Sequence, residues 1–325
     1  MYKKFCAIFL GICLSMMAVG CGNASNVPPG SKVPISPLTV AINGDMGTLD
    51  PGGTMDNMAV KITYPAYERL VKFDGGSTNI KPSLASKWEK SGDGLTWTFH
   101  LDKGHKFVDG TEVTSEAVRF SFQRILDIKK GPYDTYKIIK SINTPDKYTV
   151  QFVLSGEFPQ FLSTLATNYG SIINPKVMSH EKDGDKAQNY LANHTDGSGP
   201  YQLAEWKKGA YLKLTLNPNY SKKPSLKEVY FKLVSDPSAA RLELEKGDSD
   251  IAEGIDLDQI EKLKSNSNIS IVKKPSLLVD YVYINCTKAN PALKNPKVRQ
   301  AINYGIDYNS IIDKVMHGYA TPLAS

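Results

Sequence analysis

Cysteine is scarce in this chain of 325 residues, which contains only Cys6, Cys13, Cys21 and Cys286. The first two lie in an apolar N-terminal stretch of the kind that is removed after export, and Cys21 follows it directly. One cysteine then remains in the body of the protein. An intramolecular disulfide is therefore excluded, and a hydrophobic core must stabilise the fold.

Concentrated charge of one sign is also missing. The 39 Lys and Arg residues and 33 Asp and Glu residues give a formal charge of +6, and the lysines are scattered. Lys222-Lys223 and Lys273-Lys274 are only pairs. Binding of nucleic acid needs basic residues gathered in a patch or stripe, so we exclude a nucleic-acid partner.

The motifs of common hydrolases and nucleotide-binding proteins are absent from the sequence. It has no GxxxxGKS/T phosphate loop, no GxSxG nucleophile turn and no HExxH zinc motif. His180-Glu181 lacks the second histidine of a zinc pair, and Asp248 and Asp250 follow a predicted helix end, where acidic turn residues are common. The sequence therefore predicts a protein that is not an enzyme and that needs neither a metal nor a cofactor.

The N-terminus has the organisation of an export signal. Met1–Lys4 carries two lysines, and the apolar run Phe5–Val19 is shorter than the roughly 20 residues that a membrane-spanning helix needs. The run ends in AVGC at residues 18–21, which resembles the lipobox of bacterial lipoproteins. This resemblance implies that residues 1–20 are removed and that Cys21 is lipidated. An ordinary signal peptide that contains a cysteine is the alternative.

Residues 21–37 predict a flexible tether behind the anchor. The stretch GNASNVPPGSKVPISP is rich in Pro, Gly, Ser and Asn and poor in large apolar side chains. Such a segment buries too little surface to offset its conformational entropy. A flexible chain of this length reaches on the order of 20 Å, enough to hold a folded body just above a membrane.

The remaining chain alternates between strand and helix patterns. Trp97, Phe99 and Leu101 alternate with polar residues behind a Gly92-Asp93-Gly94 turn, which predicts a β-hairpin with one buried aromatic face. Further strands are predicted at 39–43, 148–154, 212–216 and 279–285, and helices at 60–70, around 158–165 and after Thr114, Asp236-Pro237 and Asn295-Pro296. Because strict βαβ alternation is missing, the pattern indicates an α/β protein with mixed sheets, and its length indicates two lobes.

Four groups of motifs occur in one order along the body. They are TLDP (48–51) with YERLVKFDG (67–75); the region 82–126; GSGPYQLAEW (197–206) with LNPNY (216–220) and GDSDI (247–251); and YINC (283–286) with NPKVRQAINYGIDYNSIIDKV (295–315). Together they resemble the peptide- and nickel-binding family of extracellular solute-binding proteins. The resemblance runs from Leu38 to the end of the chain, and Glu112 stands where the family usually has Pro.

The resemblance implies a two-lobed clamp of the periplasmic-binding-protein type, with mixed β-sheets. Residues 38–65 and 197–274 would form the first lobe, and residues 66–196 a subdomain inserted into it. Residues 275–325 would begin a second lobe that the chain leaves incomplete. In this arrangement, ligand contacts made by both lobes favour the closed state of the clamp.

The function implied by the resemblance is capture of oligopeptides outside the cell membrane and their delivery to an ABC importer. The partners would be the permease and ATPase subunits of that importer, with the membrane reached through the lipid anchor and the protein a monomer. A nickel chelate or an oligosaccharide as the ligand is an alternative within the same fold, and a surface peptidase is an alternative from another class.

A receptor for many peptides should bind the extended main chain and leave room for the side chains. In the family, one support for the peptide follows the LDP motif, which points to Met55, Asp56 and Asn57 here. Tyr281, on the strand that opens the second lobe, and Tyr133 and Tyr136, in a loop of the inserted subdomain, are the other predicted ligand-binding residues. For Tyr281, a place in the core is equally compatible with the pattern, and Trp88, Trp97 and Phe99 are predicted to be core residues.

Overall fold

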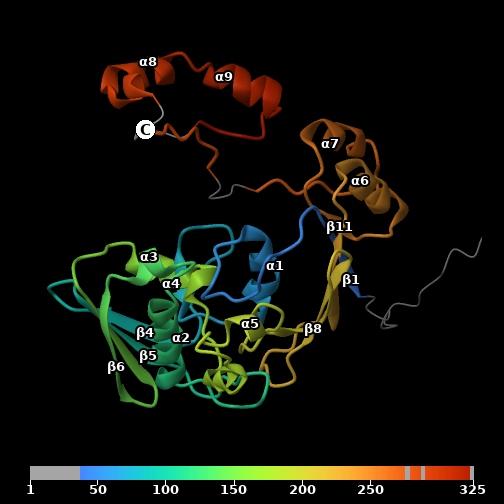
Figure 1. The fold of residues 1–325 in the computed structure, drawn as a ribbon. Helices are drawn as coiled ribbons and strands as arrows, with labels where there is room; N and C mark the ends of the chain where they lie inside the picture. Colours follow the sequence, from blue (N-terminus) through green and yellow to red (C-terminus); the bar gives the residue numbers. More distant parts are fainter. Residues whose placement is uncertain (1–36, 275–278, 287–289, 323–325) are drawn as a thin grey trace, which may run out of the picture. The chain divides into compact units, whose positions relative to one another are not determined.

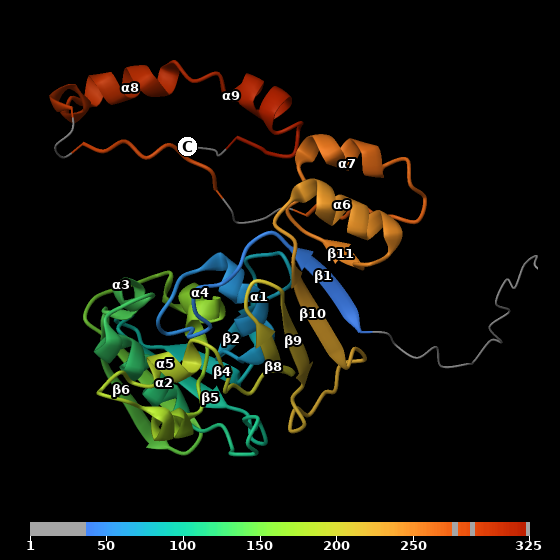
Figure 2. The same cartoon turned by 45° about the vertical axis from the view of Figure 1, so that its right-hand side comes forward.

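A computed structural model describes residues 37–274, 279–286 and 290–322. The predicted signal, Cys21 and almost all of the tether lie outside these residues. Within them, the chain builds two larger β-sheets, each covered by helices (Figures 1 and 2).

The first sheet joins the start of the described chain to its middle. Its strand order is β11 (Ile251–Ala252), β1 (Leu38–Ile42), β10 (Glu228–Leu233), β9 (Tyr211–Leu216) and β8 (Tyr201–Lys207). Strand β1 runs parallel to β10 and β11, whereas β9 is antiparallel to both of its neighbours, so the sheet is mixed as predicted. Helix α1 (Asn57–Ala66) covers one face, where Ala59 and Ile62 join the core of the sheet.

The second sheet is antiparallel and has the order β4 (Ala85–Lys90), β5 (Thr96–Leu101), β7 (Thr149–Leu154) and β6 (Ile139–Asp146). Helices α2 (Ser115–Ile128) and α4 (Phe161–Ala166) pack on it through an aromatic core that includes Phe122, Phe152 and Phe161. The predicted hairpin is confirmed: β4 pairs with β5, and Trp97, Phe99 and Leu101 are buried.

Short elements connect and extend the two sheets. They are β2 (Val71–Phe73) paired with β3 (Ile80–Pro82), α3 (Tyr133–Tyr136), α5 (Gln188–Leu191), α6 (Pro237–Lys246), α7 (Leu257–Leu263), α8 (Pro296–Tyr304), α9 (Tyr308–Ser310), a π-helical turn (Ile311–Val315) and 3-10 turns at Asn168–Gly170, Pro175–His180 and Pro291–Lys294. The predicted caps of α6 and α8 are confirmed, since Asp236 accepts from Ala239 N and Asn295 from Lys297 N. None of the described helices is both long and apolar enough to cross a bilayer.

The chain passes between the two sheets twice, and the two passages touch. Gly199 N donates a hydrogen bond of 3.0 Å to the carbonyl of Ala66. A Cβ atom on Gly197 would lie 2.2 Å from that carbonyl oxygen, and one on Gly199 would lie 2.4 Å from the carbonyl oxygen of Pro65. Only glycine allows backbones to approach this closely, which explains the GSGP sequence at the second passage.

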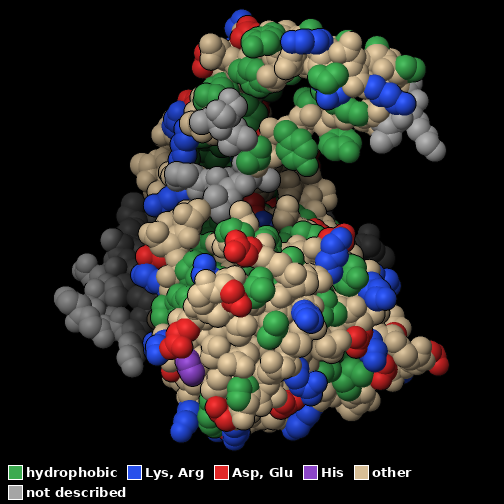
Figure 3. All heavy atoms as spheres, turned by 90° about the vertical axis from the view of Figure 1, so that its left-hand side faces the viewer, with side chains coloured by type: hydrophobic (Ala, Val, Ile, Leu, Met, Phe, Trp, Pro, Cys, Tyr) green, Lys and Arg blue, Asp and Glu red, His purple; other side chains and the backbone are tan. Residues whose placement is uncertain are grey.

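The predicted strand at residues 279–285 is wrong: the described residues 279–286 contain no strand. A strand needs a hydrogen-bonded neighbour, and no described segment pairs with this one. Its Tyr281, Val282 and Tyr283 side chains are exposed by 78%, 74% and 82%. Figure 3 shows hydrophobic side chains gathered along the C-terminal segment, among charged ones, and charges of both signs interspersed over the rest of the face shown.

Candidate functional site

A buried ion pair anchors the segment that leads into the predicted ligand-binding loop. Arg124, on α2, donates from both terminal nitrogens to the Asp50 carboxylate at 2.8 and 2.7 Å, and the two side chains are only 1% and 3% exposed. Arg124 Nε also donates to the Lys186 carbonyl at 2.7 Å. The ion pair therefore connects the LDP motif to a helix that packs on the second sheet. Both terminal nitrogens of the guanidinium group take part, as in other bidentate Arg–carboxylate pairs.

The two glycines after Pro51 fit around this ion pair. Gly52 N donates to the Asp50 carboxylate at 3.0 Å. A Cβ atom on Gly52 would lie 2.9 Å from the Arg124 guanidinium, and one on Gly53 would lie 2.9 Å from the Asp50 carboxylate. The backbone is thus held against the ion pair, and the position of the following loop, Thr54–Asn57, is fixed from its N-terminal side.

Helix α1 fixes the same loop from its C-terminal side. Asp56 is the N-cap of the helix, and its carboxylate accepts a hydrogen bond of 2.8 Å from Met58 N. Met55 is 49% exposed and Asn57 is exposed as well. The structure therefore gives Asp56 a capping role and leaves Met55 and Asn57 facing solvent, where a ligand can contact them.

The loop that carries Tyr133 lies directly against Thr54. A Cβ atom on Gly131 would lie 2.7 Å from Thr54 N and 2.8 Å from the carbonyl carbon of Gly53. Gly131 also has a φ of +50°, a conformation that glycine adopts without strain. The structure thus brings together two segments that contain residues predicted separately to bind the ligand, Thr54–Asn57 and the loop before α3.

The prediction that Tyr136 binds the ligand needs correction. Its side chain is fully buried, its ring packs edge-on against Phe122 at 5.0 Å, and its hydroxyl donates to the Thr164 carbonyl at 2.9 Å. A ligand could reach it only if the core opened. Tyr133, one turn earlier on the same short helix, is half-buried and retains exposed surface.

One aromatic residue beside the loop was not selected from the sequence. The Tyr169 hydroxyl approaches the Met55 carbonyl oxygen at 3.5 Å, the long end of hydrogen-bond range. Burial and the nearby charge of Asp56 raise the pKa of Tyr169. Tyr169 lies in a 3-10 turn without any periodic pattern, so the sequence offers no signal that would have identified it.

Tyr281 and Cys21 are the other two residues predicted to have a function. Tyr281 lies in the exposed segment described above, and Cys21 lies outside the described residues. Within the part of the chain that the structure describes, no group of three or more His, Cys, Asp or Glu side chains is placed to hold a metal ion.

Asp196, which directly precedes Gly197, should make the stability of the protein depend on pH. Burial raises its pKa to about 6, although Asn174 donates to the carboxylate at 3.1 Å. Because the pKa of Asp196 is higher in the folded state than its unfolded value of about 3.9, folding favours the protonated carboxyl group. The resulting contribution to the free energy of unfolding is complete below about pH 3.9 and is lost as the pH rises through about 6. We expect Asp196→Asn to raise the free energy of unfolding at pH 7.5 by about 1–2 kcal/mol, with a smaller gain at pH 5. Urea unfolding of both proteins at pH 7.5 and at pH 5 measures this change in the free energy of unfolding. An equal gain at the two pH values would contradict the predicted pH dependence.

Comparison with known families identifies the chain. The family model of bacterial extracellular solute-binding proteins, family 5 Middle, matches residues 79–325. The chain belongs to this family. This match confirms the family resemblance inferred from the motifs. Because the family consists of solute-binding proteins, it also confirms the expectation of a binding protein rather than an enzyme.

Individual relatives align over most of the chain. It is 41% identical over 301 residues to the probable D,D-dipeptide-binding periplasmic protein DdpA of Escherichia coli K12, an alignment that covers 91% of this chain and 58% of that protein. The chain therefore spans about 58% of the length of this relative. Two solved structures of similar fold contain different solutes.

The first is the periplasmic binding protein DppA of Helicobacter pylori in complex with the peptide STSA, with a TM-score of 0.78 and 30% identity over 88% of this chain and 59% of that one. The second is NikZ of Campylobacter jejuni in complex with Ni(L-His), with a TM-score of 0.75 and 25% identity over 90% of this chain and 58% of that one. The predicted α/β fold of the periplasmic-binding-protein type is thereby confirmed.

Proposed function

We propose that this protein captures short peptides outside the cell membrane and delivers them to an ABC importer. The observation that carries the proposal is the 41% identity to a probable D,D-dipeptide-binding protein, reinforced by the fold shared with a protein that was solved with a bound peptide. The permease and the ATPase subunits of the importer are the proposed partners. Ligand contacts that close the clamp would generate the state that the permease recognises.

The proposed ligand contacts start from the loop Thr54–Asn57. The proposed surface consists of exposed Met55 and Asn57, of Tyr169 beside Met55, and of Tyr133, whose loop lies against Thr54 through Gly131. The Asp50–Arg124 pair fixes the backbone that leads into it. A fixed surface of this kind binds an extended peptide without having to become ordered first. We retain Tyr281 in the proposed site and leave out the buried Tyr136.

A division of the chain into lobes accompanies this proposal. We assign residues 38–65 and 197–274 to the first lobe, residues 66–196 to the inserted subdomain and residues 275–325 to the second lobe. All strands of the mixed sheet come from the first group, and all strands of the antiparallel sheet come from the second, which supports the assignment.

Thermal unfolding of the purified protein tests the ligand class. The probes are D-Ala-D-Ala, L-Ala-L-Ala, the tetrapeptide STSA and Ni(L-His), each added at rising concentration. A ligand present at 100 times its Kd stabilises the folded state by about 2.7 kcal/mol, which raises Tm by several degrees. We expect at least one peptide to do so. A shift with Ni(L-His) alone would replace the peptide by a nickel chelate, and no shift with any probe would contradict the proposal.

A matched pair of variants tests the proposed contact surface. Asn57→Ala removes an exposed amide from the proposed surface, whereas Asn189→Ala removes an exposed amide from α5. We expect the first to weaken peptide binding about tenfold, the loss of one good hydrogen bond, and the second to leave it unchanged. Equal affinities of the two variants would remove Asn57 from the site.

The lipid anchor at Cys21 is the remaining part of the proposal. Two acyl chains give stable membrane attachment, whereas the protein without them should be released. We expect Cys21→Ser to move the protein from the membrane fraction to the soluble fraction when whole cells are fractionated. Cys286→Ser is the control and should leave it attached. Membrane retention of the Cys21→Ser protein would rule out this anchor.

A further inference from the structure

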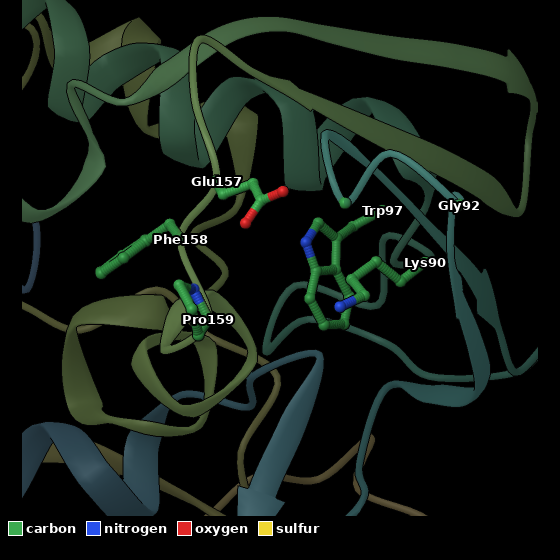
Figure 4. A pocket seen from close by; sticks show the side chains of 7 residues that line it. Lys90, Gly92, Trp97, Glu157, Phe158 and Pro159 are labelled. Carbon is green, nitrogen blue, oxygen red and sulfur yellow. The ribbon is translucent and has the colours of Figure 1, made fainter.

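A pocket of about 110 Å³ lies at the turn of the β4–β5 hairpin and shares no residue with the loop Thr54–Asn57 (Figure 4). Its lining combines the hairpin with the loop that joins β7 to α4. The lining residues are Lys90, Gly92, Gly94, Trp97, Glu157, Phe158 and Pro159. Nothing in the proposed peptide-binding function uses this pocket.

Trp97 presents an unsatisfied hydrogen-bond donor at this pocket. The side chain is only 7% exposed, and its Nε1 is buried without a hydrogen-bond partner among the described residues. Phe161 packs on the ring at 5.9 Å between centroids and Phe99 at 6.5 Å, which holds the indole in place. In Figure 4 the indole nitrogen lies on the side of the ring that faces Glu157. A buried donor without an acceptor destabilises a protein by about 1–3 kcal/mol, so an acceptor in the pocket would relieve this cost.

Two side chains of opposite charge, Lys90 and Glu157, border the pocket and do not form an ion pair with each other. Lys90 is the cross-strand partner of Trp97, and its Nζ lies 5.8 Å from the centre of the indole ring. Neither Lys90 nor Glu157 forms an ion pair with a described side chain, although Lys87 and Glu89 on the same strand pair at 2.5 Å. The lining therefore includes two donors, Trp97 Nε1 and the Lys90 ammonium group, and one carboxylate, that of Glu157.

The two glycines of the turn shape the pocket. A Cβ atom on Gly92 would meet nothing within 4 Å, so the turn leaves that side open to solvent. A Cβ atom on Gly94 would lie 3.6 Å from Cγ of Glu157, so the stem of this glutamate rests on the turn. The volume corresponds to about four water molecules at about 30 Å³ each, which suits a ligand of only a few heavy atoms.

We propose that this pocket binds a small zwitterion of the free α-amino-acid class. The carboxylate of the ligand accepts hydrogen bonds from Trp97 Nε1 and from the Lys90 ammonium group, and its own ammonium group pairs with Glu157. This arrangement satisfies the buried indole donor and leaves no net charge in the pocket. The inference is independent of which solute the proposed peptide site takes.

A titration with glycine tests the proposal. The full chain is labelled with ¹⁵N, and its three indole N–H signals are followed. We expect a saturable shift of the Trp97 signal with millimolar affinity, and unchanged signals from Trp88 and Trp206. Acetate and methylammonium supply one half of the zwitterion each and should bind about tenfold more weakly. A Trp97 signal that does not move with glycine overturns the site, and acetate that binds as tightly as glycine overturns the zwitterion.

Two variants on exposed positions complete the test without disturbing the core. Lys90→Met and Glu157→Gln should each weaken glycine binding about tenfold, because each removes one charged hydrogen bond. Lys87→Met and Glu89→Gln, on the same strand, are the controls and should bind like the unchanged protein. Equal effects of the site variants and the controls would overturn the assignment. A peptide that shifts Tm and leaves the Trp97 signal in place would separate this pocket from the peptide site.

Discussion

Gly199→Ala should destabilise the protein by about 3 kcal/mol or more. The added methyl group would lie 2.4 Å from the carbonyl oxygen of Pro65 and 2.6 Å from the carbonyl carbon of Ala66. Both contacts are with backbone atoms, so no side chain can move aside to make room. Because a folded domain is stable by only about 5–15 kcal/mol, one methyl group at this crossing should remove a large share of the total.

Urea unfolding measures this loss as a lower transition midpoint with an unchanged slope. Gly47→Ala is the matched control, since Gly47 is exposed and an added Cβ would meet nothing within 4 Å. We expect this control to be neutral or slightly stabilising, because alanine restricts the unfolded chain. Equal midpoints for the two variants would mean that the two passages are not as close as the structure places them.

Arg124→Met should cost about 3–5 kcal/mol, because it leaves the Asp50 carboxylate buried and without its partner. The guanidinium is 1% exposed and makes two hydrogen bonds to Asp50 and one to the Lys186 carbonyl. We also expect weaker binding at the proposed peptide site, since the pair holds the backbone that leads to Thr54–Asn57. Unfolding of Asp50→Asn, of Arg124→Met and of the double variant gives the coupling energy of the pair.

A second arginine on the same helix provides the control. Arg119 forms an ion pair with Glu116, but their side chains are 47% and 54% exposed. Water screens such a pair, so Arg119→Met should cost less than about 1 kcal/mol. If the two arginine variants lost similar amounts of stability, burial would not be what makes the Asp50–Arg124 pair important.

Local features of the fold were predictable from the sequence because short-range physics sets them. The Gly92-Asp93-Gly94 turn and the alternating aromatics gave the β4–β5 hairpin, and Asp236-Pro237 gave the start of α6. The helix predicted at 60–70 lies a few residues earlier, at Asn57–Ala66, because Asp56 caps it and the chain becomes extended at Tyr67.

The long-range features of the candidate site were not predictable in the same way. Asp50 and Arg124 are 74 positions apart, and no local pattern indicates that they meet. The contact of Gly131 with Thr54 likewise depends on how the two sheets pack. Tyr136 was misassigned because a tyrosine in a loop has the same sequence signal whether it turns toward the core or toward solvent.

Residues 279–285 show the same limit for strands. Their composition favours a strand, but composition supplies no hydrogen-bonded neighbour, and in the described part of the chain none pairs with them. A β-prone sequence thus predicts what a segment can form, and the rest of the fold decides whether it does.

Native mass spectrometry of the protein extracted from its own cell envelope tests the central claim most directly. The solutes that travel with the protein are released by denaturation and identified by fragmentation. We expect masses of short peptides bound one to one with the protein, and rebinding when those peptides are added back. Release of a nickel complex or a sugar, or failure of the protein to retain any peptide from an added mixture, would contradict it.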